Sequence, residues 1–124
     1  MDMPSGLDFD APGLAAVLVT LPGAELDALP YGVVEMDPET RVLRYNLTES
    51  RWSGLSRDQV LGRLFFVEVA PCSDNRHVSR RYQEDSLDET LAYTFSLRMS
   101  PVPVTLRLLK AAGDKRMYLL VKWH

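Results

Sequence analysis

Alternation of apolar and polar residues is clearest in the second half of the chain. From position 91 to 99, apolar side chains take every second position and smaller or polar ones lie between them, which is the two-residue period of a half-buried strand. Apolar runs resume at 104–110 and 117–123, after breaks that contain proline and glycine. The pattern predicts three consecutive antiparallel strands.

Two shorter apolar runs, 32–36 and 41–45, flank a segment that contains Asp37-Pro38. An Asp-Pro turn between apolar runs predicts a β-hairpin. Residues 1–28 differ, because their short apolar patches are interrupted by two Pro-Gly pairs. We expect this segment to form a cap of one or two short helices on the core, residues 29–124.

Short helical segments are predicted between the two groups of strands. Asn46 is a candidate helix cap, and Ser56 precedes Gln59 by the three residues of a capping box. Beyond position 72, we expect an exposed connector helix from Ser73 or Asp74 to about Ser86, because its apolar content is thin. The predicted fold is α+β, with a five-stranded antiparallel sheet, short helices over one face and the N-terminal cap.

Composition narrows the class of protein. A chain of 124 residues with 46% hydrophobic residues is expected to form a single domain, residues 1–124. The net charge of −3 gives no electrostatic reason to expect nucleic acid or a membrane surface as partner. One cysteine cannot close an internal disulfide, and the longest apolar run is too short to span a bilayer. We expect a cytoplasmic monomer or weak dimer.

Tyr45, Glu49 and Ser53 recur at intervals of four residues. On a helix that begins near Asn46, such residues share one face and lie close enough to share hydrogen bonds. If that face is buried, desolvation favours the protonated form of Glu49, which then becomes a hydrogen-bond donor. The alternative is that Glu49 lies in water, as most glutamates do.

Cys72 is the only cysteine and follows Pro71. Its place before a predicted helix start favours a thiolate, which can be acylated. The alternative is an inert, buried thiol. No metal-ligand spacing, phosphate-binding loop or Ser-His-Asp set is recognisable, and His77 is a weak candidate for a base beside Cys72.

Several of these stretches resemble the photoactive yellow protein family, the small blue-light receptors built on a PAS fold. They recur in the family's order, from about position 29 to 122, and include Leu43-Arg44-Tyr45-Asn46 with Glu49, Phe65-Phe66 through Val69-Ala70-Pro71-Cys72, Tyr93-Thr94-Phe95 with Met99, and Val121-Lys122. The Phe-Phe to Ala-Pro-Cys segment is the most specific of them.

The resemblance implies that Cys72, beside Pro71, holds p-coumaric acid as a thioester. Tyr45 and protonated Glu49 would hydrogen-bond the phenolate oxygen of this chromophore, and Ser53 would support Tyr45. Phe95 and Met99 would line the pocket, and Met99 would assist thermal return to the dark state.

The resemblance also implies a non-enzymatic signalling mechanism. Light would isomerise the chromophore from trans to cis, Glu49 would give up its proton, and a segment that includes the cap would loosen for an unknown downstream protein. Leu55 stands where better-known members carry an arginine, so we expect different photocycle rates. The alternative function is a PAS interaction or metabolite-binding module with a structural cysteine and no chromophore.

Overall fold

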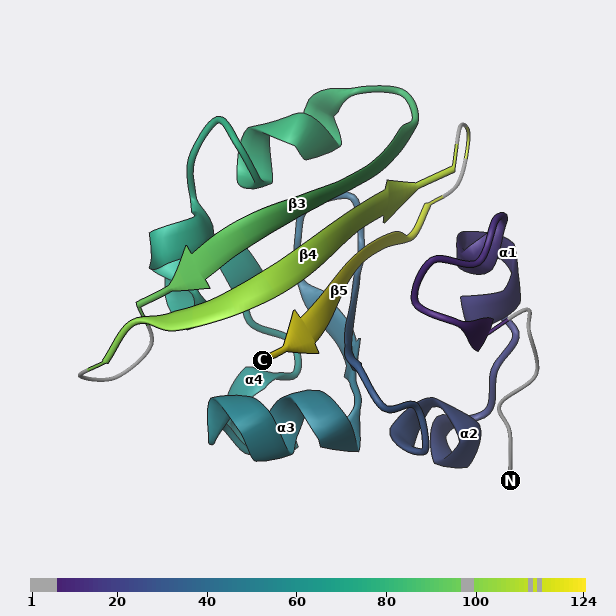
Figure 1. Cartoon of the computed structure of the whole chain (residues 1–124). Coiled ribbons are helices and arrows are strands. Elements are labelled where there is room, and N and C mark those ends of the chain that lie inside the picture. Colours follow the sequence, from purple (N-terminus) through teal and green to yellow (C-terminus); the bar gives the residue numbers. More distant parts are fainter. Residues whose placement is uncertain (1–6, 97–99, 112, 114) are drawn as a thin grey trace.

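A single antiparallel sheet of five strands organises the chain. The computed structural model describes residues 7–96, 100–111, 113 and 115–124. The sheet has the order β2-β1-β5-β4-β3 (Figure 1), and its strands are β1 (Gly32–Met36), β2 (Val42–Tyr45), β3 (Leu87–Phe95), β4 (Val102–Lys110) and β5 (Met117–Trp123). The predicted hairpin and three-stranded meander are confirmed, and β5 joins them by pairing with both β1 and β4.

The two faces of the sheet carry separate hydrophobic clusters. Along β5, Met117, Leu119 and Val121 face one cluster, while Tyr118 and Leu120 face the other. This alternation follows from the two-residue period of a strand. The sheet is therefore covered on both sides, which explains why residues 117 to 121 of its central strand are all buried.

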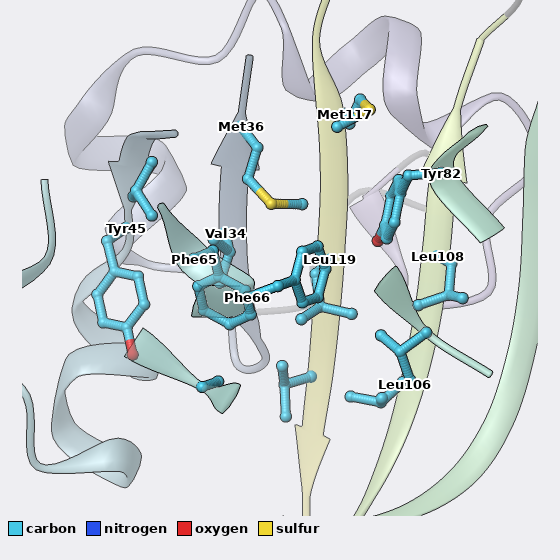
Figure 2. Packing of buried hydrophobic residues seen from close by; sticks show 14 of the residues in the cluster. Val34, Met36, Tyr45, Phe65, Phe66, Tyr82, Leu106, Leu108, Met117 and Leu119 are labelled. Atoms are coloured by element: carbon cyan, nitrogen blue, oxygen red, sulfur yellow. The ribbon is translucent and has the colours of Figure 1, made fainter. Parts of the chain in front are cut away.

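One face, which we call the helical face, packs against the segment between the two groups of strands. That segment contains α3 (Leu47–Ser53), α4 (Arg57–Val60), the π-helix η2 (Phe65–Val69) and the 3-10 helices η3 (Pro71–Ser73) and η4 (Ser79–Gln83). Figure 2 shows Phe65, Phe66 and Tyr82 lying over strand residues such as Leu119. In Figure 1, α3 lies beside the C-terminal end of β5, and Trp123 of β5 contacts Glu49 and Trp52 of α3.

The other face, which we call the cap face, carries the two short N-terminal helices, α1 (Leu14–Leu18) and α2 (Gly23–Asp27). Their presence confirms the predicted helical cap. The division into residues 1–28 and 29–124 stays a prediction.

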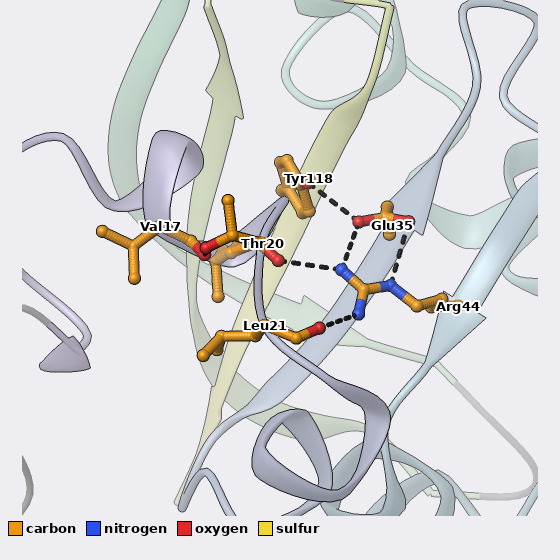
Figure 3. Close-up of polar contacts among 7 residues, drawn as sticks. Val17, Thr20, Leu21, Glu35, Arg44 and Tyr118 are labelled. Carbon is orange, nitrogen blue, oxygen red and sulfur yellow. Dashed lines mark hydrogen bonds and ion pairs between the residues drawn. The ribbon is translucent and has the colours of Figure 1, made fainter.

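A partly buried ion pair ties the cap to the sheet. Arg44 bonds both carboxylate oxygens of Glu35, through Nε at 3.0 Å and Nη2 at 2.7 Å, and Tyr118 donates its hydroxyl to Glu35 Oε2 at 2.8 Å. The same guanidinium donates to the carbonyl oxygens of Leu18 and Leu21, at 2.8 and 2.6 Å (Figure 3). Nearby, Arg107 donates to two further cap carbonyls. The cap is thus held by charge as well as by apolar contact.

The predicted connector helix ending near Ser86 is wrong. In its place the chain forms η3, a turn and η4. The Asn75 side chain accepts from the backbone N–H groups of His77 and Val78, which closes a turn instead of a helix. Val78 and Tyr82 are buried, and the Tyr82 hydroxyl donates to the carbonyl of Tyr118. These anchors to the sheet outweigh the weak local helix signals.

The first strand of the meander starts earlier than predicted, at Leu87 instead of Leu91. Its side chains alternate between more and less exposed positions as far as Phe95, as the apolar period indicates. The predicted positions 97 and 99, including the candidate pocket residue Met99, lie outside the described residues.

Candidate functional site

The Asn46 side chain fixes where α3 begins. Asn46 is fully buried, and its Oδ1 accepts from the backbone N–H groups of Glu49 and Val33, at 3.0 and 2.9 Å. Its Nδ2 donates to the carbonyl oxygens of Leu26 and Tyr31, at 2.9 and 3.0 Å. The predicted helix cap is confirmed, and the same amide also joins α2, β1 and α3. The first turn of α3, which carries Glu49, is held rigidly over the sheet.

Glu49 lies on the inner face of α3, and its residue is only 2% exposed. Its carboxyl Oε1 accepts from the indole Nε1–H of Trp123 at 2.7 Å. Burial raises the pKa of Glu49 from its ordinary value of 4.5 to about 8, and the Trp123 hydrogen bond opposes part of that rise. Within the described ranges, no cation forms an ion pair with Glu49. The raised pKa favours the protonated carboxyl at neutral pH. The alternative prediction, that Glu49 lies in water, is wrong.

Gly32 in β1 makes room for this carboxyl. A Cβ atom at position 32 would overlap Glu49 Oε1 and would come within 3.0 Å of the Glu49 Cβ. Only glycine lets α3 approach β1 so closely without displacing the acid. The buried position of Glu49 is thus built into the sheet as well as into the helix.

Tyr45 and Ser53 form a second buried pair beside Glu49. The Tyr45 hydroxyl donates to Ser53 Oγ at 2.9 Å, and Ser53 Oγ also accepts from the backbone N–H of Leu55 at 3.2 Å. Burial raises the pKa of the Tyr45 phenol well above its usual range, and the charge of ionised Glu49 adds to this rise.

The predicted convergence of the three side chains is therefore confirmed only in part. Tyr45 and Ser53 bond to each other, whereas Glu49 bonds Trp123 and shares no hydrogen bond with them. The four-residue spacing places Glu49 and Ser53 on the inner side of α3, whereas Tyr45 reaches the site from the end of β2. It does not reveal that the last strand supplies a competing donor.

Cys72 is a free, half-buried thiol in η3, packed against the hydrophobic cluster of the helical face. Its carbonyl oxygen accepts from the Tyr93 hydroxyl at 2.6 Å and from Asn75 Nδ2 at 3.2 Å. Asn75 Nδ2 also donates to the Tyr93 hydroxyl at 2.7 Å. This triangle fixes the cysteine backbone against β3 while leaving the thiol partly accessible.

The remaining predicted residues are spread along the same region. Phe95 is 1% exposed, and its ring contacts Tyr93 edge-on and Trp123 at a tilt, whereas Pro71 is exposed. Trp123 was not predicted to belong to the site. Its position two residues after Val121 on a strand places it on the helical face, and this register was the signal that could have found it.

Neither a metal centre nor a membrane-spanning helix is found among the described residues. No group of three or more His, Cys, Asp or Glu side chains among them is arranged to hold a metal ion. None of the helices in the described segments is long and apolar enough to cross a membrane.

Comparisons with known proteins identify the family. No family model matches the chain. The photoactive yellow protein of Halochromatium salexigens is 30% identical over 109 residues, which cover 85% of this chain and 87% of that protein. The photoactive yellow protein of Rhodothalassium salexigens is 29% identical over 103 residues, which cover 80% and 82% of the two chains.

Solved structures agree with these relatives. The photoactive yellow protein domain of the sensor histidine kinase Ppr from Rhodospirillum centenum matches with a TM-score of 0.80 and 36% identity, covering 86% of this chain and 97% of that domain. A PAS domain of an HTR-like protein from Haloarcula marismortui matches with a TM-score of 0.66 at 20% identity, which supports the fold alone. The chain is a PAS sensor domain that belongs to the photoactive yellow protein family.

Proposed function

We propose that this protein is a blue-light receptor that carries p-coumaric acid as a thioester on Cys72. The observation that supports this function most strongly is the burial of Glu49, whose carboxyl forms no ion pair with any residue that the structure describes and whose pKa burial raises to about 8. Burying an acid of this kind costs free energy, and groups with strongly shifted pKa values are concentrated at functional sites. Donation of the Glu49 proton to a phenolate oxygen would be such a function.

The residues at the site fit this chromophore. The thiol of Cys72 is partly accessible and lies against the cluster that also contains Tyr45 and Phe95. These groups would supply an anchor, a phenol donor and an aromatic wall. When bound, the p-coumaroyl group would supply the absorption of blue light and the trans-cis isomerisation.

The protein's own side chains would control the charge of the phenolate. Tyr45 would donate its hydroxyl to the phenolate oxygen and Glu49 its carboxyl proton, because two charge-assisted hydrogen bonds can stabilise a buried anion. Ser53 would hold Tyr45 in place through the contact that already joins them. Met99 belongs to the proposed pocket by resemblance alone.

After isomerisation, Glu49 would give up its proton to the phenolate oxygen and remain as a buried carboxylate. A buried charge without a cation destabilises the surrounding structure by several kcal/mol, which is a large share of the stability of a small domain. We propose that the resulting partial unfolding, beginning in the cap, is the signal, that a partner protein binds the loosened state, and that the chain catalyses no reaction of its own.

The test is acylation of the apoprotein with an activated p-coumaroyl ester. Wild type should gain one acyl group by mass and a visible absorption band that blue light bleaches reversibly. Cys72→Ser should show neither, while Glu49→Gln should still be acylated but should absorb at a shifted wavelength. A wild-type protein that forms no adduct, or forms one without a visible band, would contradict the proposal.

A PAS interaction or metabolite-binding module is the second candidate. Leu55 favours it, because this half-buried apolar side chain packs against the cluster at the position where better-known family members carry an arginine. Such a module would be colourless and insensitive to light, and its Cys72 thiol would resist the activated ester.

A further inference from the structure

The indole of Trp123 is the one polar contact that the described part of the chain offers to the Glu49 carboxyl. It donates to Oε1 from the end of β5, 74 residues away in sequence. Its ring also stacks on Trp52, with centroids 6.0 Å apart and planes 7° apart, and contacts Phe95 with centroids 5.8 Å apart. Hydrogen bond and ring contacts together fix the position of the indole.

Three elements hold this arrangement. Helix α3 provides both the acceptor, Glu49, and the stacking partner, Trp52, which follows it by three residues and lies one turn along the helix. Strand β5 provides the donor, and β3 provides Phe95. Trp52 is 56% exposed, so the stack forms the outer rim of the site and the carboxyl its inner end. The exposed Trp52 ring thereby restricts the orientation of the Trp123 indole.

We propose that Trp123 is the positioning residue for the Glu49 acid. Its indole N–H holds Oε1 as an acceptor, which places the acidic proton on Oε2, and it stabilises the carboxylate that remains after proton donation. The geometric part of this inference concerns the apoprotein, whereas its consequence for the light reaction rests on the proposed function.

The chemistry of the indole supports this role. An indole N–H only donates, so it cannot take the proton of the acid and must face an oxygen that accepts. In a neutral carboxyl group the better acceptor is the carbonyl oxygen, and Oε2 is then the oxygen that carries hydrogen. Hydrogen bonds to an ionised oxygen are roughly twice as strong as neutral ones, so the indole favours the carboxylate over the acid.

Few other groups near Glu49 in the described part of the chain could position its carboxyl. From β2, Tyr45 is the titratable group that interacts electrostatically with Glu49, and its hydroxyl is engaged with Ser53. From β1, Gly32 offers no side chain. The Trp123 hydrogen bond is accordingly the interaction that lowers the pKa of Glu49 against the effect of burial.

The first experiment uses the full-length apoprotein and proton-nitrogen NMR of the two indole N–H groups. The Trp123 resonance should move as the pH passes through the titration of Glu49 near 8, and Glu49→Gln should abolish that movement. Trp123→Phe, which keeps an aromatic ring but removes the N–H, should raise the pKa of Glu49 by about one unit. Trp52→Phe, which keeps a stacking ring, is the matched control and should shift that pKa much less.

A Trp123 resonance that does not respond to Glu49, or a Glu49 pKa that is unchanged in Trp123→Phe, would overturn the inference even if the protein binds the chromophore. The second experiment uses acylated protein. Trp123→Phe should shift the visible band to longer wavelength, because a weaker acid donates less strongly to the phenolate, and should speed the return to the dark state several-fold. Failure of acylation in wild type would instead overturn the proposed function and leave the NMR result standing.

Discussion

Two glutamates are buried to the same degree on opposite faces of one sheet, and they differ in the groups that contact their carboxyl oxygens. Glu35 and Glu49 are each 2% exposed. On the cap face, Glu35 receives a two-point contact from Arg44 and a hydroxyl from Tyr118. On the helical face, the hydrogen bond that Glu49 receives from the described part of the chain is the neutral indole N–H of Trp123.

The difference shows that the partners of a buried carboxyl decide what it does, and that burial alone does not. The guanidinium of Arg44 lies against the carboxylate of Glu35, and this ion pair ties the sheet to the cap. Glu49 has no such cation among the residues that the structure describes, and burial raises its pKa to about 8, which favours the protonated form at neutral pH. One glutamate is a structural contact, and the other is an acid that can release its proton.

The largest effect should come from removing the cation on the cap face. Arg44→Leu leaves Glu35 as an uncompensated buried charge and frees two cap carbonyls, so we expect a loss of about 4 kcal/mol in the free energy of unfolding. Urea unfolding of the variant and the wild type measures this loss. Arg63→Leu, which removes a well-exposed arginine, should change the stability by less than about 0.5 kcal/mol. If Arg44→Leu lowers the free energy of unfolding as little as the control does, then Glu35 does not depend on Arg44, and the contrast between the two glutamates is wrong.

The second effect is a pH dependence that belongs to Glu49. The folded state holds its proton up to about pH 8, whereas the unfolded chain releases it near pH 4.5. The stability that the Glu49 proton gives to the folded state is therefore fully present below pH 4.5 and is lost as the pH rises through 8. Between pH 5 and 8 the free energy of unfolding should fall by about 3 kcal/mol.

Glu49→Gln isolates this contribution, because an amide does not titrate. Its free energy of unfolding, measured by urea at pH 5, 6, 7 and 8, should stay nearly level over the range in which the wild type declines. Equal slopes for the two proteins would show that Glu49 is ionised throughout, like a carboxylate with a cation beside it.

A smaller effect should follow from filling the space beside Glu49. Gly32→Ala introduces a Cβ where Oε1 lies, so the carboxyl must move away from Trp123, and we expect a loss of about 2 kcal/mol. Gly23→Ala in α2 is the matched control, since a Cβ there meets no atom within 4 Å. If both variants unfold at the same urea concentration as the wild type, then Glu49 is not held closely against β1.

Features set by nearby residues were predictable from the sequence. The hairpin follows from the apolar runs around Asp37-Pro38, and the helix start follows from Asn46 and its cap. The order of motifs from Tyr45 to Cys72 indicates the family. In each case the signal and the structure lie within a few residues of each other.

Features set by distant residues were not predictable in the same way. Trp123 reaches Glu49 only because the last strand lies at the centre of the sheet, beside β1. The expected connector helix is likewise replaced by turns because Tyr82 is anchored to Tyr118. Such tertiary contacts override local propensity, and they decide which donor the acid meets.

We propose that the buried carboxyl of Glu49 is neutral in the dark state and gives up its proton in the light reaction. Infrared difference spectroscopy of the acylated protein, illuminated minus dark, detects this proton transfer. Light should remove the carbonyl band of a protonated carboxyl group in the wild type, and this change should be absent in Glu49→Gln. Two results would contradict this proposal. One is an acylated wild-type protein that bleaches without losing this band, and the other is an acylated Glu49→Gln protein that loses the same band.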